Sequence, residues 1–139
     1  MFYPKPMEKT YTISGVAECI GVSIDTLRYY ERIGLIHEVD RLSNTHRRYT
    51  ESDIQWIQFL LRLRATGMSI QQMLTYARLQ RLGESTLRER VAMLKAHHEQ
   101  VEVHIQQMQE YLAVLDYKIT VYESTLLARE TEKGEERAL

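Results

Sequence analysis

The second half of the chain carries an unbroken heptad pattern, and this pattern restricts the fold more strongly than any other feature. From residue 84 to residue 126, mostly apolar side chains recur at alternating spacings of four and three. Neither glycine nor proline interrupts residues 84–133. A pattern sustained for more than five heptads predicts a left-handed coiled coil. Its seam consists of Leu87, Val91, Leu94, His98, Val101, Ile105, Met108, Leu112, Leu115, Ile119, Tyr122 and Leu126.

The length of this helix decides what can cover its seam. At 1.5 Å per residue, residues 84–126 would form a helix roughly 65 Å long. Such a helix cannot fold back on itself without a turn, and it is too long to bury its seam against a small domain. A single helix packed on its own domain is the alternative, and it fits poorly at this length. We therefore expect a second copy of the chain to cover the seam.

Two short helices are predicted near the N-terminus. Ser14 can cap a helix over residues 15–20, and Gly21 can end it, because glycine tolerates the left-handed conformation of a helix stop. Ser23 can cap a second helix over residues 24–33. The turn between them has the length found in a helix-turn-helix motif.

Residues 34–49 alternate between apolar and polar positions and predict a two-stranded wing. Two capping boxes follow, one at residues 50–53 and one at residues 69–72. Each should open a helix, and these helices should end at Gly67 and Gly83.

The predicted fold is mainly α: a winged helix-turn-helix head with a small β-hairpin wing, then a helical pair and a long coiled-coil dimerisation helix. We expect an N-terminal arm at 1–11, the head with its auxiliary helices at 12–82, and the coiled coil at 84–127. Residues 128–139 are charged and unpatterned, which is typical of a flexible tail.

Charge and composition narrow the possible partners. Residues 1–82 carry 11 Lys and Arg against 8 Asp and Glu, a balance of +3, whereas residues 83–139 carry 7 against 11, a balance of −4. A basic head on an acidic helix favours a polyanion partner at the N-terminal end. The sequence contains neither an 18-residue apolar run nor a signal peptide, so we expect a cytoplasmic protein without a membrane partner.

The second helix and the wing carry side chains suited to double-stranded DNA. Arg28 and Tyr29 lie opposite the packing stripe of Leu27, where they can read base edges or phosphates. Hydroxyl groups on Thr26 and Tyr30 can donate to phosphate oxygens, and a basic wing can lie along the duplex backbone. Alternatively, this stretch is a solvated charge beside two core aromatics. The predicted DNA contacts are Ser23, Thr26, Arg28, Tyr29, Tyr30, Arg41, Arg47 and Arg48.

A series of motifs over residues 12–125 follows the order found in one known family. The motifs are Thr12-Ile13, Val16-Ala17, Gly21-Val22-Ser23, Thr26-Leu27-Arg28-Tyr29-Tyr30-Glu31, Gly34-Leu35-Ile36, Asn44-Thr45-His46-Arg47-Arg48-Tyr49, Asp53-Ile54 and Gly67-Met68-Ser69-Ile70. Together with the closing coiled coil, they resemble the MerR family of transcription regulators. In the wing, Thr45 and His46 stand where the family usually has Gly-Tyr.

The resemblance implies a homodimer whose long helices pair antiparallel. Each head would place its recognition helix in the major groove of a pseudo-palindromic promoter, and the dimer would bend and untwist the DNA so that RNA polymerase can engage it. Carried over by position, Arg28 and Tyr29 would contact bases or phosphates, Tyr30 would support the recognition helix, and Arg47 would grip the backbone.

The resemblance implies no particular effector for this chain. Too few residues follow Leu126 to enclose a drug-binding pocket, and Arg62 stands where the aldehyde- and electrophile-stress subgroup has its reactive cysteine. Cys19 and the seam residue His98 could respond to a thiol-reactive compound, a metal or pH. We interpret Cys19 instead as a small helix residue and His98 as a polar residue that fixes the coiled-coil register.

Three alternatives to an effector-controlled regulator remain. Without an effector the chain would be an architectural DNA-binding protein or a repressor, and with a protein-binding head it would be a coiled-coil adaptor. An enzyme is not expected, because the sequence contains no paired acid and base, nucleophile constellation or phosphate-binding glycine loop. We expect neither a cofactor nor a bound metal, because no cysteine lies around the start or end of the long helix and no carboxylate-histidine spacing supports a metal site.

Overall fold

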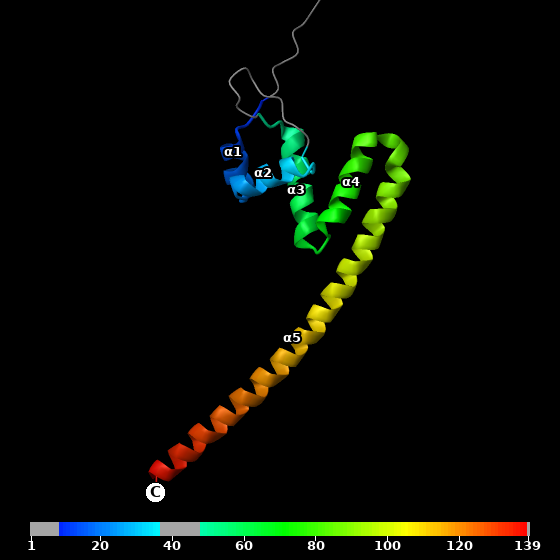
Figure 1. Cartoon of the computed structure of the whole chain (residues 1–139). Coiled ribbons are helices and arrows are strands. Elements are labelled where there is room, and N and C mark those ends of the chain that lie inside the picture. The colour runs from blue at the N-terminus through cyan, green and yellow to red at the C-terminus, as the bar shows by residue number, and fades with distance from the viewer. Residues whose placement is uncertain (1–8, 37–47, 139) are drawn as a thin grey trace, which may run out of the picture. The chain divides into compact units, whose positions relative to one another are not determined.

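The structure is a computed structural model that describes residues 9–36 and 48–138. It divides into two compact units, Met1–Leu94 and Lys95–Leu139. Its helices are α1 (Ile13–Ile20), α2 (Ile24–Arg32), α3 (Glu51–Ala65), α4 (Ile70–Leu82), a short 3-10 turn (Glu84–Thr86) and α5 (Leu87–Ala138), as Figure 1 shows. The prediction of a mainly α fold is confirmed, whereas the predicted wing strands fall largely on residues 37–47, outside the described residues.

The first helix begins earlier than its sequence predicts. Thr12 is its N-cap and accepts a hydrogen bond from the backbone N–H of Gly15 at 3.1 Å, so the expectation that Ser14 caps this helix is wrong. Ser14 lies inside the first turn. As expected, Gly21 stops α1, with a left-handed φ of 79°.

The other predicted caps are confirmed. Ser23 accepts from the backbone N–H of Thr26 at 3.1 Å and starts α2. Both capping boxes are complete: Thr50 pairs with Asp53 at the start of α3, and Ser69 pairs with Gln72 at the start of α4. Each box satisfies two backbone N–H groups that a helix start leaves open.

The first unit has a continuous apolar core. α1 packs against α2 and α3 packs against α4 (Figure 1). Each of these helices contributes apolar side chains to the core. The buried side chains are Val16, Ala17, Leu27, Tyr30, Leu35, Ile36, Tyr49, Ile57, Leu60, Leu63, Met68, Met73, Tyr76 and Ala77.

A backbone bridge ties the start of the head to the end of the wing segment. Tyr11 and Tyr49 exchange two backbone hydrogen bonds, both of 2.8 Å, in an antiparallel bridge. Tyr11 therefore belongs to the folded head rather than to the arm expected at 1–11. Tyr49 is fully buried.

α5 is longer than the coiled coil that the sequence predicts. It spans 52 residues and continues to Ala138, through the segment expected to be a flexible tail. The expectation rested on the missing apolar pattern, but Ala, Arg, Glu and Lys, which dominate this segment, are strong helix formers in their own right.

The corner between α4 and α5 is closed by side chains. The Thr86 hydroxyl donates to the Leu79 carbonyl oxygen at 2.6 Å, and the Arg90 guanidinium donates to the Thr86 hydroxyl and to the Gly83 carbonyl oxygen at 3.0 Å each. Arg90 also reaches the Gln80 side chain at 2.7 Å. These contacts satisfy carbonyl groups that the end of α4 leaves open.

Candidate nucleic-acid interface

The outward face of α2 presents the predicted recognition residues together. Arg28 and Tyr29 are exposed, whereas Leu27, one position earlier, is fully buried. The Arg32 guanidinium lies 5.8 Å from the centre of the Tyr29 ring, a cation–π contact that adds Arg32 to the residues predicted for this face. Spacing could have revealed it, because residues three apart are neighbours on a helix surface.

Polar side chains at the start of α2 serve two purposes. The Ser23 hydroxyl caps the helix and also lies 2.8 Å from the Thr26 hydroxyl. Ser23 is the N-cap of α2 and Thr26 lies in its first turn. Hydroxyl and backbone N–H groups at a helix N-terminus suit phosphate oxygens.

Tyr30 lies on the opposite side of α2 from Arg28. It is only 5% exposed and packs in the core, whereas contact of its hydroxyl with a phosphate stays a prediction. Burial raises the pKa of Tyr30, an effect that nearby Arg64 partly offsets. The buried position fits the supporting role that the resemblance implies.

Of the three predicted wing cations, Arg48 lies within the described residues. Arg41 and Arg47 lie outside the described residues, and Arg48 is half-buried beside the Tyr11–Tyr49 bridge. Arg48 is therefore less available to solvent than the residues on the outer face of α2.

Two donors hold the turn that follows α2. The indole N–H of Trp56, on α3, donates to the Leu35 carbonyl oxygen at 2.9 Å. The Arg81 guanidinium, near the end of α4, donates to the Gly34 carbonyl oxygen. Gly34 has a φ of 91°, a left-handed conformation that favours glycine. α3 and α4 thus fix the turn at the C-terminal end of the proposed recognition helix, α2.

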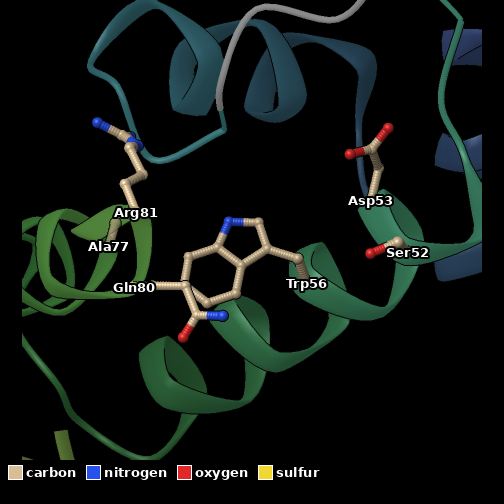
Figure 2. A pocket seen from close by; sticks show the side chains of 6 residues that line it. All are labelled: Ser52, Asp53, Trp56, Ala77, Gln80 and Arg81. Carbon is tan, nitrogen blue, oxygen red and sulfur yellow. The ribbon is translucent and has the colours of Figure 1, made fainter. Parts of the chain in front are cut away.

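The same two donors line a pocket. It has a volume of about 250 Å³ and is bordered by Ser52, Asp53, Trp56, Ala77, Gln80 and Arg81 (Figure 2). The pocket has no signal in the sequence, because residues from α3 and the last turns of α4 meet there only after the chain folds.

The seam residues of α5 remain uncovered along most of the helix. About half or more of the surface of Leu87, Ile105, Met108, Leu112 and Leu115 is exposed. His98 pairs with Glu102 one turn later on the same helix, at 3.1 Å, and both side chains face solvent.

Neither a membrane span nor a metal cluster occurs in the described ranges. Every helix there is too short or too polar to cross a bilayer, and no group of three His, Cys, Asp or Glu side chains there could hold a metal ion. Cys19 is exposed on α1.

Comparisons with known proteins give a consistent result. The MerR HTH family regulatory protein model matches residues 11–79, and the MerR DNA-binding model matches residues 54–117. An uncharacterized HTH-type transcriptional regulator of Haemophilus influenzae is 36% identical over 114 residues, which cover 82% of this chain and 84% of the relative.

Two solved structures share the fold. HiNmlR, a MerR family regulator lacking the sensor domain and crystallised bound to promoter DNA, superimposes with a TM-score of 0.79 at 35% identity, covering 84% of this chain and 92% of that one. A MerR family transcriptional regulator from Bacillus thuringiensis gives a TM-score of 0.75 at 28% identity, covering 81% and 98%.

Proposed function

The chain belongs to the MerR family of DNA-binding transcriptional regulators, and from this premise we propose that it binds a pseudo-palindromic promoter site as a homodimer and distorts the DNA to control initiation by RNA polymerase. The outer face of α2 is the observation that carries this proposal. Arg28 and Tyr29 project from a helix whose inner face is locked into the core, so the helix can enter a major groove as a rigid unit.

The DNA-bound relative supports the choice of partner. HiNmlR holds promoter DNA with a fold that this chain matches over 84% of its length, and it does so without a sensor domain. The matched region includes α2, so this likeness supports promoter DNA as the partner of this chain.

We further propose that the partner of α5 is a second copy in antiparallel orientation. Charges beside the seam favour this arrangement. With the pair centred between Ile105 and Met108, Arg88 would face the partner's Glu123 and Lys95 would face the partner's Asp116. The whole seam from residue 87 to residue 126 would then be covered.

Other pairings are less favourable. A shift of one heptad in either direction would bring Glu102 beside the partner's Glu102 or the partner's Asp116, which are like charges. A parallel pair would bring Arg90 beside the partner's Lys95 and His98 against the partner's His98. A parallel pair also covers the seam and brings Lys118 beside the partner's Glu123, but the repulsion between Arg90 and the partner's Lys95 opposes this attraction. The centred antiparallel register covers the seam with two kinds of attractive pair, each present twice by symmetry.

Cysteine cross-linking tests the register. In a Cys19→Ser background, His98→Cys with Leu115→Cys should form disulfide-linked dimers. These positions lie about 25 Å apart on one helix, so the bond must join two chains. His98→Cys paired with Met108→Cys or with Tyr122→Cys reports the two shifted registers. Stronger cross-linking in either of these would overturn the centred register.

Footprinting tests promoter binding. The purified protein should protect DNA flanking its own gene at two half-sites related by two-fold symmetry. Enhanced cleavage between the half-sites would report the distortion, and protection of a single half-site would contradict a dimer on the promoter. Transcription in vitro with and without small electrophiles separates an effector-controlled regulator from an architectural protein or a repressor.

A further inference from the structure

The pocket beside the turn that follows α2 has the size of a small-ligand site. Its volume of about 250 Å³ lies just below the range of about 300–1,000 Å³ that drug-sized ligands occupy. A compound with a single substituted ring therefore fits it better than a larger effector does.

A rigid aromatic surface forms one side of this pocket. Trp56 stacks on Tyr76 with ring centres 5.9 Å apart and an interplanar angle of 14°, and its indole N–H is held by the Leu35 carbonyl oxygen. Ala77 adds a small apolar surface nearby (Figure 2). An indole fixed in this way offers a planar ligand ring an apolar contact without a further loss of side-chain freedom.

The two charged groups at the pocket, Asp53 and Arg81, differ in their exposure and in their hydrogen-bond partners. The Asp53 carboxylate is 8% exposed, accepts from the backbone N–H of Thr50 at 2.8 Å, and lies in the first turn of α3, where the helix dipole stabilises it. Arg81 is exposed, and its guanidinium donates to a neutral acceptor, the Gly34 carbonyl oxygen. A guanidinium has five N–H donors, so Arg81 retains donors and a positive charge for a ligand.

We propose that this pocket binds a small aromatic carboxylate, with its ring against the indole of Trp56 and its carboxylate on the guanidinium of Arg81. Arginine suits this ligand because its planar fork matches the two oxygens of a carboxylate. The polar side chains of Ser52 and Gln80 border the same space and can bind substituents on the ring.

A ligand in the pocket would weaken the hydrogen bonding of the turn that follows α2. A carboxylate that draws Arg81 away from the Gly34 carbonyl oxygen leaves that turn with one donor fewer, and operator affinity falls as a result. By linkage, operator DNA then weakens binding of the carboxylate by the same factor. This step rests on the proposed function, whereas binding of the ligand does not.

Tryptophan fluorescence measures the binding step directly, since Trp56 is the only tryptophan in the chain. The probes are benzoate, benzamide and benzamidine, which share a ring and differ in charge. Benzoate should change the emission with an affinity about tenfold higher than that of benzamide, which corresponds to about 1.4 kcal/mol. Benzamidine should bind most weakly, because its charge has the same sign as that of Arg81.

A pair of arginine variants localises the effect. Arg81→Ala should remove the preference for benzoate, whereas Arg78→Ala, an exposed position on the same helix outside the pocket, should retain it. Equal affinities for the three probes, tighter binding of benzamidine, or an unchanged benzoate affinity in Arg81→Ala would overturn the site. Thermal unfolding of each variant checks that the head stays folded.

A second measurement addresses the link to DNA. Operator affinity should fall when benzoate saturates the wild-type protein and should not respond to benzamide at the same concentration. An unchanged operator affinity at saturating benzoate would overturn the link. Because the fluorescence titration contains no DNA, failure of the pocket and failure of promoter binding give different results.

Discussion

The head and the C-terminal part of α5 place their apolar side chains in opposite environments. Val16, Leu27 and Ile57 are fully buried within one chain, whereas Ile105 and Leu112 keep half or more of their surface exposed. A single exposed leucine is ordinary, but a continuous apolar row of this length marks an interaction surface. One chain therefore completes the fold of the head, whereas the seam of α5 stays exposed in one chain and would be buried by the second copy proposed above.

Exposure alone does not identify the contact face of α5. Val103 and Val114 lie away from the seam and are 54% and 65% exposed, close to the 50% of Ile105 and the 57% of Leu112. Only the heptad spacing distinguishes the seam from the other faces of α5. Substitutions at equally exposed positions on and off the seam therefore test most directly whether the seam is the contact face.

The largest effect is expected from charges placed in the seam. Ile105→Asp with Leu112→Asp removes four apolar side chains from the proposed dimer, each worth roughly 1.5–3 kcal/mol when buried. Sedimentation equilibrium should then show a monomer. Val103→Asp with Val114→Asp is the matched control and should stay dimeric. Dissociation of both variants to the same extent would break the distinction between the two faces.

Truncation of a buried side chain in the head should destabilise the head of each chain independently of its partner. Leu60 is fully buried, so Leu60→Ala should lower the free energy of unfolding of the head by about 2–5 kcal/mol. Leu127→Ala, at a 65% exposed position off the seam, should change it by less than about 0.5 kcal/mol. Denaturant unfolding followed by Trp56 fluorescence measures both values. A loss for Leu127→Ala as large as that for Leu60→Ala would show that the helix and the head do not unfold separately.

Removal of a recognition side chain should weaken DNA binding without affecting the dimer. Arg28→Ala is expected to weaken operator binding by about 1–3 kcal/mol if Arg28 reads a base edge. Arg129→Ala removes an equal charge far along α5 and serves as the control. Fluorescence anisotropy at several salt concentrations distinguishes the two roles of Arg28, because loss of a phosphate contact lowers the salt slope by about one. Equal losses in both variants would indicate a general charge effect.

The smallest effect concerns the charges beside the seam. Lys95→Glu should weaken dimerisation by about 0.2–1 kcal/mol for each of the two symmetric pairs, since exposed ion pairs contribute little. Adding Asp116→Lys should restore the dimer, because the reversed pair is again attractive. A double variant no more stable than Lys95→Glu alone would reject this pairing, and the dimer dissociation constant at low salt is the measurement.

Local features of the fold were predictable from the sequence, whereas contacts between distant segments were not. The capping boxes at Thr50 and Ser69 act over three residues and were therefore visible in the sequence. The contact of Arg81 with Gly34 joins residues 47 positions apart and depends on the packing of α4 beside the turn after α2. For this reason the pocket could not be predicted.

The sequence predicted only part of the distribution of buried and exposed residues on α2. Leu27 and Tyr30 are three residues apart and share the buried side of the helix, so the periodicity could have placed Tyr30 in the core. Its hydroxyl suggested phosphate contact instead. The heptads, in contrast, marked the seam directly, since each position repeats the same signal over the whole length of the helix.

The closed corner between α4 and α5 has a mechanical consequence. The joint contains Gly83, but Thr86 donates to the Leu79 carbonyl oxygen and Arg90 donates to Thr86 and to the Gly83 carbonyl oxygen. The joint therefore resists bending more than a glycine-containing loop without such contacts would. In the proposed dimer, a torque applied along α5 would reach α4 through this joint. Twisting of promoter DNA by such a dimer would draw on the stiffness of a few hydrogen bonds at each of two corners.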